Sequence, residues 1–136
     1  MKLLLSFVVI IALSSAKAQY SFSVKSLNEI NMETKETIST IEVNQFFNFS
    51  LKDEFMIHNL IDEYGNIEDS QFYKIIKKEE KNNITFLSCE SGVSGLVYQY
   101  FISDDEENGI QLFQYLEENS IYQMDGKSSP CKTFKQ

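Results

Sequence analysis

The sequence predicts an all-β domain: an antiparallel meander of eight or nine strands with at most one short helix. Runs of β-branched and aromatic residues recur along the chain, and Gly, Asn or Asp stands at the joints between them. The one proline, Pro130, lies outside these runs, so no run contains a residue that cannot donate to a β ladder. Strands that follow one another in this way close into a small up-and-down barrel or fold over as a two-sheet sandwich.

The clearest strands lie between Asn82 and Met124. Each run holds five to seven residues and ends at a turn signal, such as the small-residue loop Glu90–Gly95 or the acidic loop Ser103–Gly109. The four strands predicted here are Ile84–Cys89, Leu96–Ile102, Ile110–Leu116 and Ser120–Met124. A polar tail, Lys127–Gln136, follows them.

The N-terminal part of the chain is less regular. Tyr20–Lys25 alternates between polar and apolar residues and predicts a first strand. The polar segment Asn28–Thr40 predicts a loop with one helical turn, leading into a short strand at Ile38–Val43. Gln45–Leu51 alternates again, and we expect Phe47, Phe49 and Leu51 on the face turned to the core.

The segment 51–65 permits two interpretations. Its apolar residues follow helical spacing, at Ile57, Leu60, Ile61 and Tyr64. The cluster Asp62–Asn66 is also a turn signal, between the run Phe55–Ile61 and the strand-like run Ser70–Lys77. We predict the hairpin, with a helix as the alternative, and a charged turn at Lys77–Asn82 after it.

Residues 1–18 have the pattern of a secretory signal peptide. Lys2 gives a positive start, Leu3–Leu13 is an apolar run, and Ala16–Ala18 fits the small-residue cleavage site. The apolar run is shorter than the ~20 residues that span a bilayer. We therefore expect a secreted protein that begins at Gln19 and forms one β-domain over residues 19–136, with no membrane insertion after cleavage.

The charge balance disfavours nucleic acid and anionic membrane surfaces as partners. The chain has 20 Asp and Glu against 12 basic residues, all of them lysine. Loss of the two lysines of the signal leaves a net charge of about −10, which repels phosphate groups. The absence of arginine also removes the planar side chain that binds phosphate or carboxylate through two hydrogen bonds.

Two pairs of residues are candidates for covalent modification. Cys89 and Cys131 predict a disulfide, because an even number of cysteines in an exported chain usually pairs. Asn48 and Asn83 stand in N-x-S/T sequons and are possible glycosylation sites if the source is eukaryotic. In a bacterium the protein would be periplasmic or extracellular, and the sequons would carry no meaning.

No catalytic, cofactor-binding or metal-binding residue is predicted. His58 is the single histidine, and no nucleophile lies in a motif that it would activate, so a hydrolase is disfavoured. The loop Asp104–Gly109 matches the first positions of a calcium-binding EF-hand loop, but Tyr115 replaces the final glutamate. We therefore expect a solvated hairpin turn there, with weak calcium binding as the alternative. We expect a protein that is not an enzyme.

The predicted strand order resembles a lipocalin-type β-barrel in outline. The resemblance covers the meander and the C-terminal tail tied back by a disulfide; the lipocalin G-x-W signature is missing, because the chain has no tryptophan. It implies a small apolar ligand held in a barrel. The alternative is a protein–protein interaction module, because the runs Leu96–Ile102 and Ile110–Leu116 carry large apolar groups on both faces.

Overall fold

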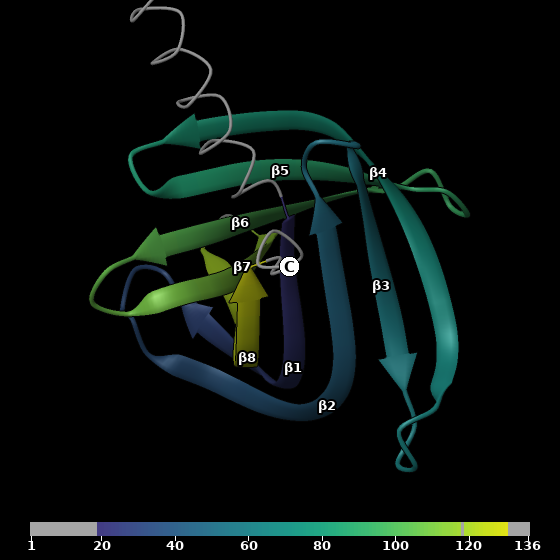
Figure 1. Cartoon of the computed structure of the whole chain (residues 1–136). Helices are drawn as coiled ribbons and strands as arrows, with labels where there is room; N and C mark the ends of the chain where they lie inside the picture. The colour runs from purple at the N-terminus through teal and green to yellow at the C-terminus, as the bar shows by residue number, and fades with distance from the viewer. Residues whose placement is uncertain (1–18, 118, 131–136) are drawn as a thin grey trace, which may run out of the picture.

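The computed structural model describes residues 19–117 and 119–130, which form eight antiparallel strands in a closed barrel (Figure 1). The strands are β1 (Gln19–Asn31), β2 (Thr37–Ser50), β3 (Phe55–Ile61), β4 (Ile67–Lys81), β5 (Ile84–Ser91), β6 (Val97–Asp105), β7 (Gly109–Glu117) and β8 (Ser120–Pro130). Each strand pairs with the next, and β1 pairs with β8 to close the barrel. The all-β meander and the barrel predicted from the sequence are confirmed. Within the described part of the chain, no helix has the length and apolar character needed to cross a membrane.

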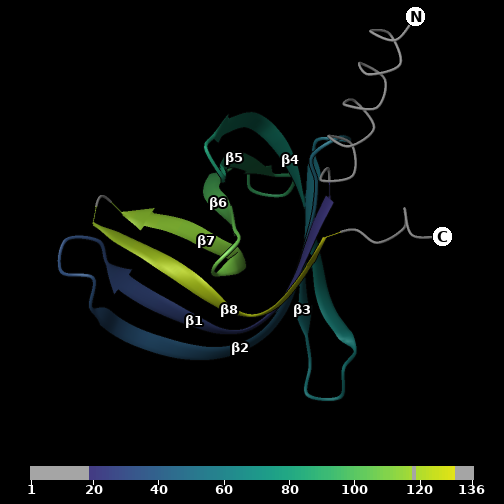
Figure 2. The same ribbon diagram turned by 60° about the vertical axis from the view of Figure 1, so that its left-hand side comes forward.

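The barrel is strongly bent, and its hairpins extend in different directions. In Figure 2, β7, β8, β1 and β2 form one curved sheet that projects to the left, while β3 and β4 run downward from the barrel. The strand register shifts at β-bulges in β1 between Val24 and Ser26 and in β4 between Ile75 and Lys77. A bulge adds a residue to one strand of a pair and so increases its bend and twist.

The barrel interior is filled by apolar and aromatic side chains. Phe47, Phe49 and Leu51 all face the interior, as the alternation predicted. The ring of Phe49 packs edge-on against Phe22 and Tyr100, with centroids 5.9 and 5.7 Å apart. Each fully buried phenylalanine stabilises the fold by about 1.5–3 kcal/mol. The most deeply buried side chains, less than 2% exposed, are Phe47, Phe49, Met56, Ile75, Leu87, Ile102, Leu112, Val24 and Cys89.

The first hairpin differs from the sequence prediction. The segment 28–40, expected as a loop with a helical turn, holds the end of β1, a turn at 32–36 and the start of β2. The turn forms locally, because the side-chain oxygen of Asn31 accepts the N–H groups of Glu33 and Thr34 at 2.9 and 3.1 Å. The two strands predicted over 38–51 are one strand, β2, so the barrel has eight strands and not nine.

Two predicted strand ends are also wrong. The charged turn expected at 77–82 is strand through Lys81, and the turn lies at Asn82 and Asn83, with Asn82 at a φ of 57°. The charged residues of β4 do not end the strand, because their side chains are exposed to solvent. The tail predicted to begin at Lys127 is strand as far as Pro130.

The hairpin predicted in the segment 51–65 is confirmed, and the helical alternative is excluded. β3 and β4 pair from Phe55 to Ile61, and the turn between them is stabilised by Asp62. The Asp62 carboxylate accepts the N–H groups of Tyr64 and Asn66 at 2.9 and 2.8 Å. Gly65 has a φ of 86°, which glycine adopts without strain.

Candidate functional site

A row of three phenylalanines crosses the outer surface of the barrel. Phe86 on β5, Phe101 on β6 and Phe113 on β7 are directly opposite one another in the strand register. They face outward, because their chain neighbours Leu87, Tyr100 and Leu112 are buried in the core. The rings of Phe101 and Phe113 stack with centroids 4.8 Å apart, and those of Phe86 and Phe101 lie 5.8 Å apart.

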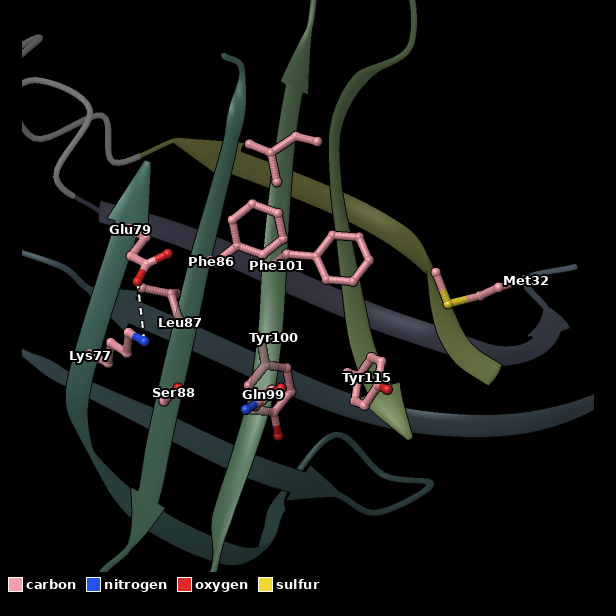
Figure 3. Close-up of a pocket in the computed structure, with 11 residues that line it drawn as sticks. Met32, Lys77, Glu79, Phe86, Leu87, Ser88, Gln99, Tyr100, Phe101 and Tyr115 are labelled. Carbon is pink, nitrogen blue, oxygen red and sulfur yellow. Dashed lines mark ion pairs between the residues drawn. The ribbon is translucent and has the colours of Figure 1, made fainter. Parts of the chain in front are cut away.

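Part of this aromatic row lines a groove of about 540 Å³ (Figure 3). The groove lies on the outer faces of β4 to β7 and is bounded on one side by Met32 from the turn between β1 and β2. That turn is anchored next to β7 and β8, because the Met32 N–H donates to the Asn119 carbonyl at 2.8 Å. The residues that line the groove are Met32, Lys77, Glu79, Ile84, Phe86, Leu87, Ser88, Gln99, Tyr100, Phe101 and Tyr115.

The groove has an apolar centre and a few polar groups at its margin. In Figure 3 the rings of Phe86 and Phe101 lie next to each other, and Tyr115 lies further along β7. Lys77 and Glu79 stand on β4 at the opposite side from Met32 and form an exposed ion pair of 3.1 Å. An apolar centre with few polar groups is the usual composition of a small-molecule site.

A second, polar group of side chains lies inside the barrel around His58. The imidazole Nε2 is 3.0 Å from the side-chain oxygen of Gln45, and the Tyr73 hydroxyl donates to Gln71 at 2.8 Å. Burial lowers the pKa of His58, and the charge of the Asp69 carboxylate opposes this shift. Burial raises the pKa of Tyr73. Each group is therefore neutral at physiological pH, and this arrangement holds no activated nucleophile.

The acidic loop after β6 folds as a hairpin turn. The Asp105 carboxylate accepts the N–H groups of Glu107 and Asn108 at 2.6 and 3.1 Å. These hydrogen bonds lower the pKa of Asp105. Among the described residues, no three His, Cys, Asp or Glu side chains come together in a way that could hold a metal ion.

The predicted modification sites fall in different parts of the fold. Cys89 lies in the core on β5, where burial raises the pKa of its thiol to about 12. Cys131 lies outside the described residues, so the disulfide stays a prediction. Asn83 is exposed in the turn between β4 and β5, and Asn48 is half-buried on β2 between core-facing neighbours.

Sequence patterns gave only part of this site. The sequence shows large apolar side chains on both faces of the runs that form β6 and β7, and these side chains include Phe101 and Tyr115 of the groove. Met32, Lys77 and Glu79 were missed, because they belong to segments predicted as a loop and a turn. No local pattern links Met32 to β7, since the two meet only through the closure of the barrel. No protein-family model, curated protein or solved structure matches the chain.

Proposed function

We propose that the protein is an exported, non-catalytic β-barrel that binds a small apolar ligand in the groove on the outer faces of β4 to β7. The observation that carries this proposal is the groove itself, which has a volume of about 540 Å³ and a floor made by Phe86 and Phe101. Small-molecule sites in proteins usually enclose about 300–1,000 Å³ and bury their ligand against hydrophobic and aromatic side chains.

The groove is a better place for the ligand than the centre of the barrel. Phe49 and Met56 are 0% exposed, so neither of them borders a space wide enough for water. A ligand at that depth would have to displace well-packed core side chains. The apolar ligand expected from the lipocalin-like outline is therefore assigned to the outer surface.

The chemistry of the groove supports binding and not catalysis. Its polar side chains are an exposed ion pair, Lys77–Glu79, together with Ser88, Gln99, Tyr100 and Tyr115. The pair is exposed to solvent at the margin of the groove, so its role in this proposal is to orient a ligand.

A protein partner on the same surface is the second candidate. The aromatic row continues past the groove to Phe113, so its apolar area is larger than the groove alone. Aromatic side chains that face solvent in this way are typical of the centre of protein–protein interfaces. The two candidates differ in which residues matter: a small ligand needs Phe101 and not Phe113, whereas a flat interface needs both.

The test is a titration of the protein that begins at Gln19 with a fluorescent apolar probe, such as an anilinonaphthalene sulfonate. We expect saturable binding that Phe101→Ala weakens about tenfold, which corresponds to 1.4 kcal/mol of lost apolar contact. The matched control is Phe72→Ala, an outward phenylalanine on β4 that does not line the groove; it should leave binding unchanged.

Two results would contradict the proposal. Equal loss of binding in both variants, or no binding at all, would exclude the groove as the site. Turnover of an ester, glycoside or peptide that disappears when one carboxylate is replaced would show that the protein is an enzyme.

A further inference from the structure

The first half of β2 has a strand neighbour on one side only. β2 pairs with β1 along its whole length, from Ser50 to Thr37, but it pairs with β3 only from Ser50 to Gln45. No described strand pairs with the other side of 37–43. Both views show this part of β2 as the lower rim of the curved sheet, with no ribbon beyond it (Figures 1 and 2).

An edge of this kind offers unpaired hydrogen-bonding groups. In an antiparallel pair, a strand directs alternate N–H and C=O groups to its neighbour and the remainder to the opposite side. Along 37–43 the remainder points away from β1, toward solvent. Such a row is a template on which another extended segment can add as a further strand.

A second free edge, on β4, is protected by charge, and this one is not. β4 continues beyond its last pair with β3, Lys74–Phe55, and its residues 77–81 (KKEEK) are all charged. Charged side chains of this kind prevent unwanted strand pairing. The β2 edge reads TISTIEV and carries one charge, at Glu42; its side chains Ile38 and Ile41 are 56% and 46% exposed.

The β2 edge is held in place by β1, the strand with which it pairs. β1 pairs with it through Leu27 and Asn28, which lie opposite Ile41 and Thr40. Leu27 also packs against the barrel core, and the Thr40 hydroxyl donates to the Asn28 side chain at 2.9 Å. A strand that is already ordered loses little conformational entropy when a partner binds, so addition at this edge is favoured.

The charges around the edge select the partner. Six acidic residues stand on β1, on β2, in the β1–β2 turn and in the β3–β4 turn, where the Asp62 carbonyl accepts from the Asn44 side chain. They are Glu29, Glu33, Glu36, Glu42, Asp62 and Glu63, and the same segments hold two lysines, Lys25 and Lys35. Lys25 is already engaged, since its ammonium donates to the Asn44 side chain at 2.6 Å. The edge is thus surrounded by negative charge, and the whole chain has a net charge of −8. A second copy of the chain would be repelled, whereas a basic segment would be attracted.

We propose that residues 37–43 of β2 form a strand-addition site for an extended segment of another protein, with β-branched residues at its centre and lysine or arginine at its ends. The main-chain hydrogen bonds of β2 supply the attachment, and the surrounding carboxylates supply the preference for positive charge. This site is separate from the aromatic groove, so either can fail without the other.

The experiment measures amide hydrogen exchange at 37–43 by NMR, with and without a probe peptide of alternating valine and threonine flanked by lysines. We expect the solvent-facing amides of 37–43 to exchange at least about tenfold more slowly when the peptide is bound, because they gain hydrogen bonds. A peptide with glutamate flanks should bind more weakly, and a peptide with methylated backbone nitrogens should not protect these amides.

Two isoleucine-to-lysine substitutions, one on the β2 edge and one on β4, provide a test variant and its matched control. Ile38→Lys should abolish protection, because lysine on an edge strand opposes strand addition; Ile76→Lys, at a similarly exposed isoleucine on β4, should have no effect. Unchanged exchange at 37–43 at saturating peptide would overturn the proposal. So would a dimer of this chain in light scattering that Ile38→Lys dissociates, because the occupant would then be a second copy.

Discussion

The imidazole of His58 lies flat against the phenyl ring of Phe47 inside the barrel, with ring centroids 4.2 Å apart and 10° between the ring planes. The two residues are direct partners across β2 and β3. The stack places a titratable ring in an apolar environment, and Gln45 is the group that bonds its Nε2 atom. The folded protein therefore favours the neutral form of His58, in agreement with the lowered pKa.

This burial predicts that the folded state loses stability as the pH falls below about 6.5, the pKa of an unperturbed histidine. In that range the unfolded chain binds a proton that the folded chain does not, so the free energy of unfolding decreases with decreasing pH. The loss stops below the lowered pKa of the folded state, where both states are protonated. Urea unfolding at pH 5, 6 and 7.5 would measure it.

His58→Gln provides the control, because glutamine keeps a polar group near Gln45 and does not titrate. The variant should be less stable than the parent at pH 7.5, since the stack on Phe47 is lost. It should also lose most of the change in stability between pH 7.5 and pH 5. The explanation would be wrong if the variant kept the full pH dependence, because His58 is the single histidine of the chain.

A close approach of two backbones makes Gly126 essential to the barrel. Gly126 lies opposite Val24 at the bulge of β1, and a Cβ atom at residue 126 would come within 1.8 Å of the Ser23 carbonyl oxygen. Gly126→Ala should therefore destabilise the fold by about 3 kcal/mol, the upper end of the range for overpacking. Thermal or urea unfolding would measure the change.

Gly92→Ala is the matched comparison for this prediction. A Cβ atom at residue 92 would lie 3.2 Å from the Phe72 carbonyl oxygen, a contact that a small shift relieves. Its cost should be clearly smaller, about 1 kcal/mol. Equal destabilisation by the two substitutions would mean that the approach of β1 to β8 does not limit the side chain at residue 126.

The strand order and the interior face of the barrel could be predicted from the sequence because both depend on local patterns. Alternation assigned Phe47 and Phe49 to the core, and turn residues such as Gly65 separated the strands. Each of these signals lies within a few residues of the feature that it specifies.

The long hairpin arms and the groove could not be predicted in the same way. Polar residues over 28–40 and charged residues over 77–81 predicted loops, because a strand with one buried face carries apolar residues at alternate positions. In the structure these residues lie on strands that extend beyond the barrel. The groove depends on contact between Met32 and the end of β7, which are distant in sequence. Such contacts depend on the closure of the barrel and on its β-bulges, and no short sequence pattern predicts either of these features.

The burial of Cys89 restricts how the predicted disulfide with Cys131 can form. The Cys89 side chain is 0% exposed, and its thiol, with a pKa of about 12, is protonated at neutral pH. The thiolate is the form that attacks a disulfide, so the bond has to form before β5 is buried in the core. We expect oxidation to occur during folding and not afterwards.

The folded, oxidised protein should accordingly contain no free thiol, even in denaturant, as measured by alkylation and intact mass. Cys131→Ser should lower the free energy of unfolding by about 4 kcal/mol, because the bond closes a loop of about 42 residues. In that variant Cys89 should resist alkylation at pH 8 in the native state and react fully in denaturant. Two alkylated cysteines in the denatured protein would refute the disulfide, as would Cα atoms of residues 89 and 131 more than about 7 Å apart in an experimental structure.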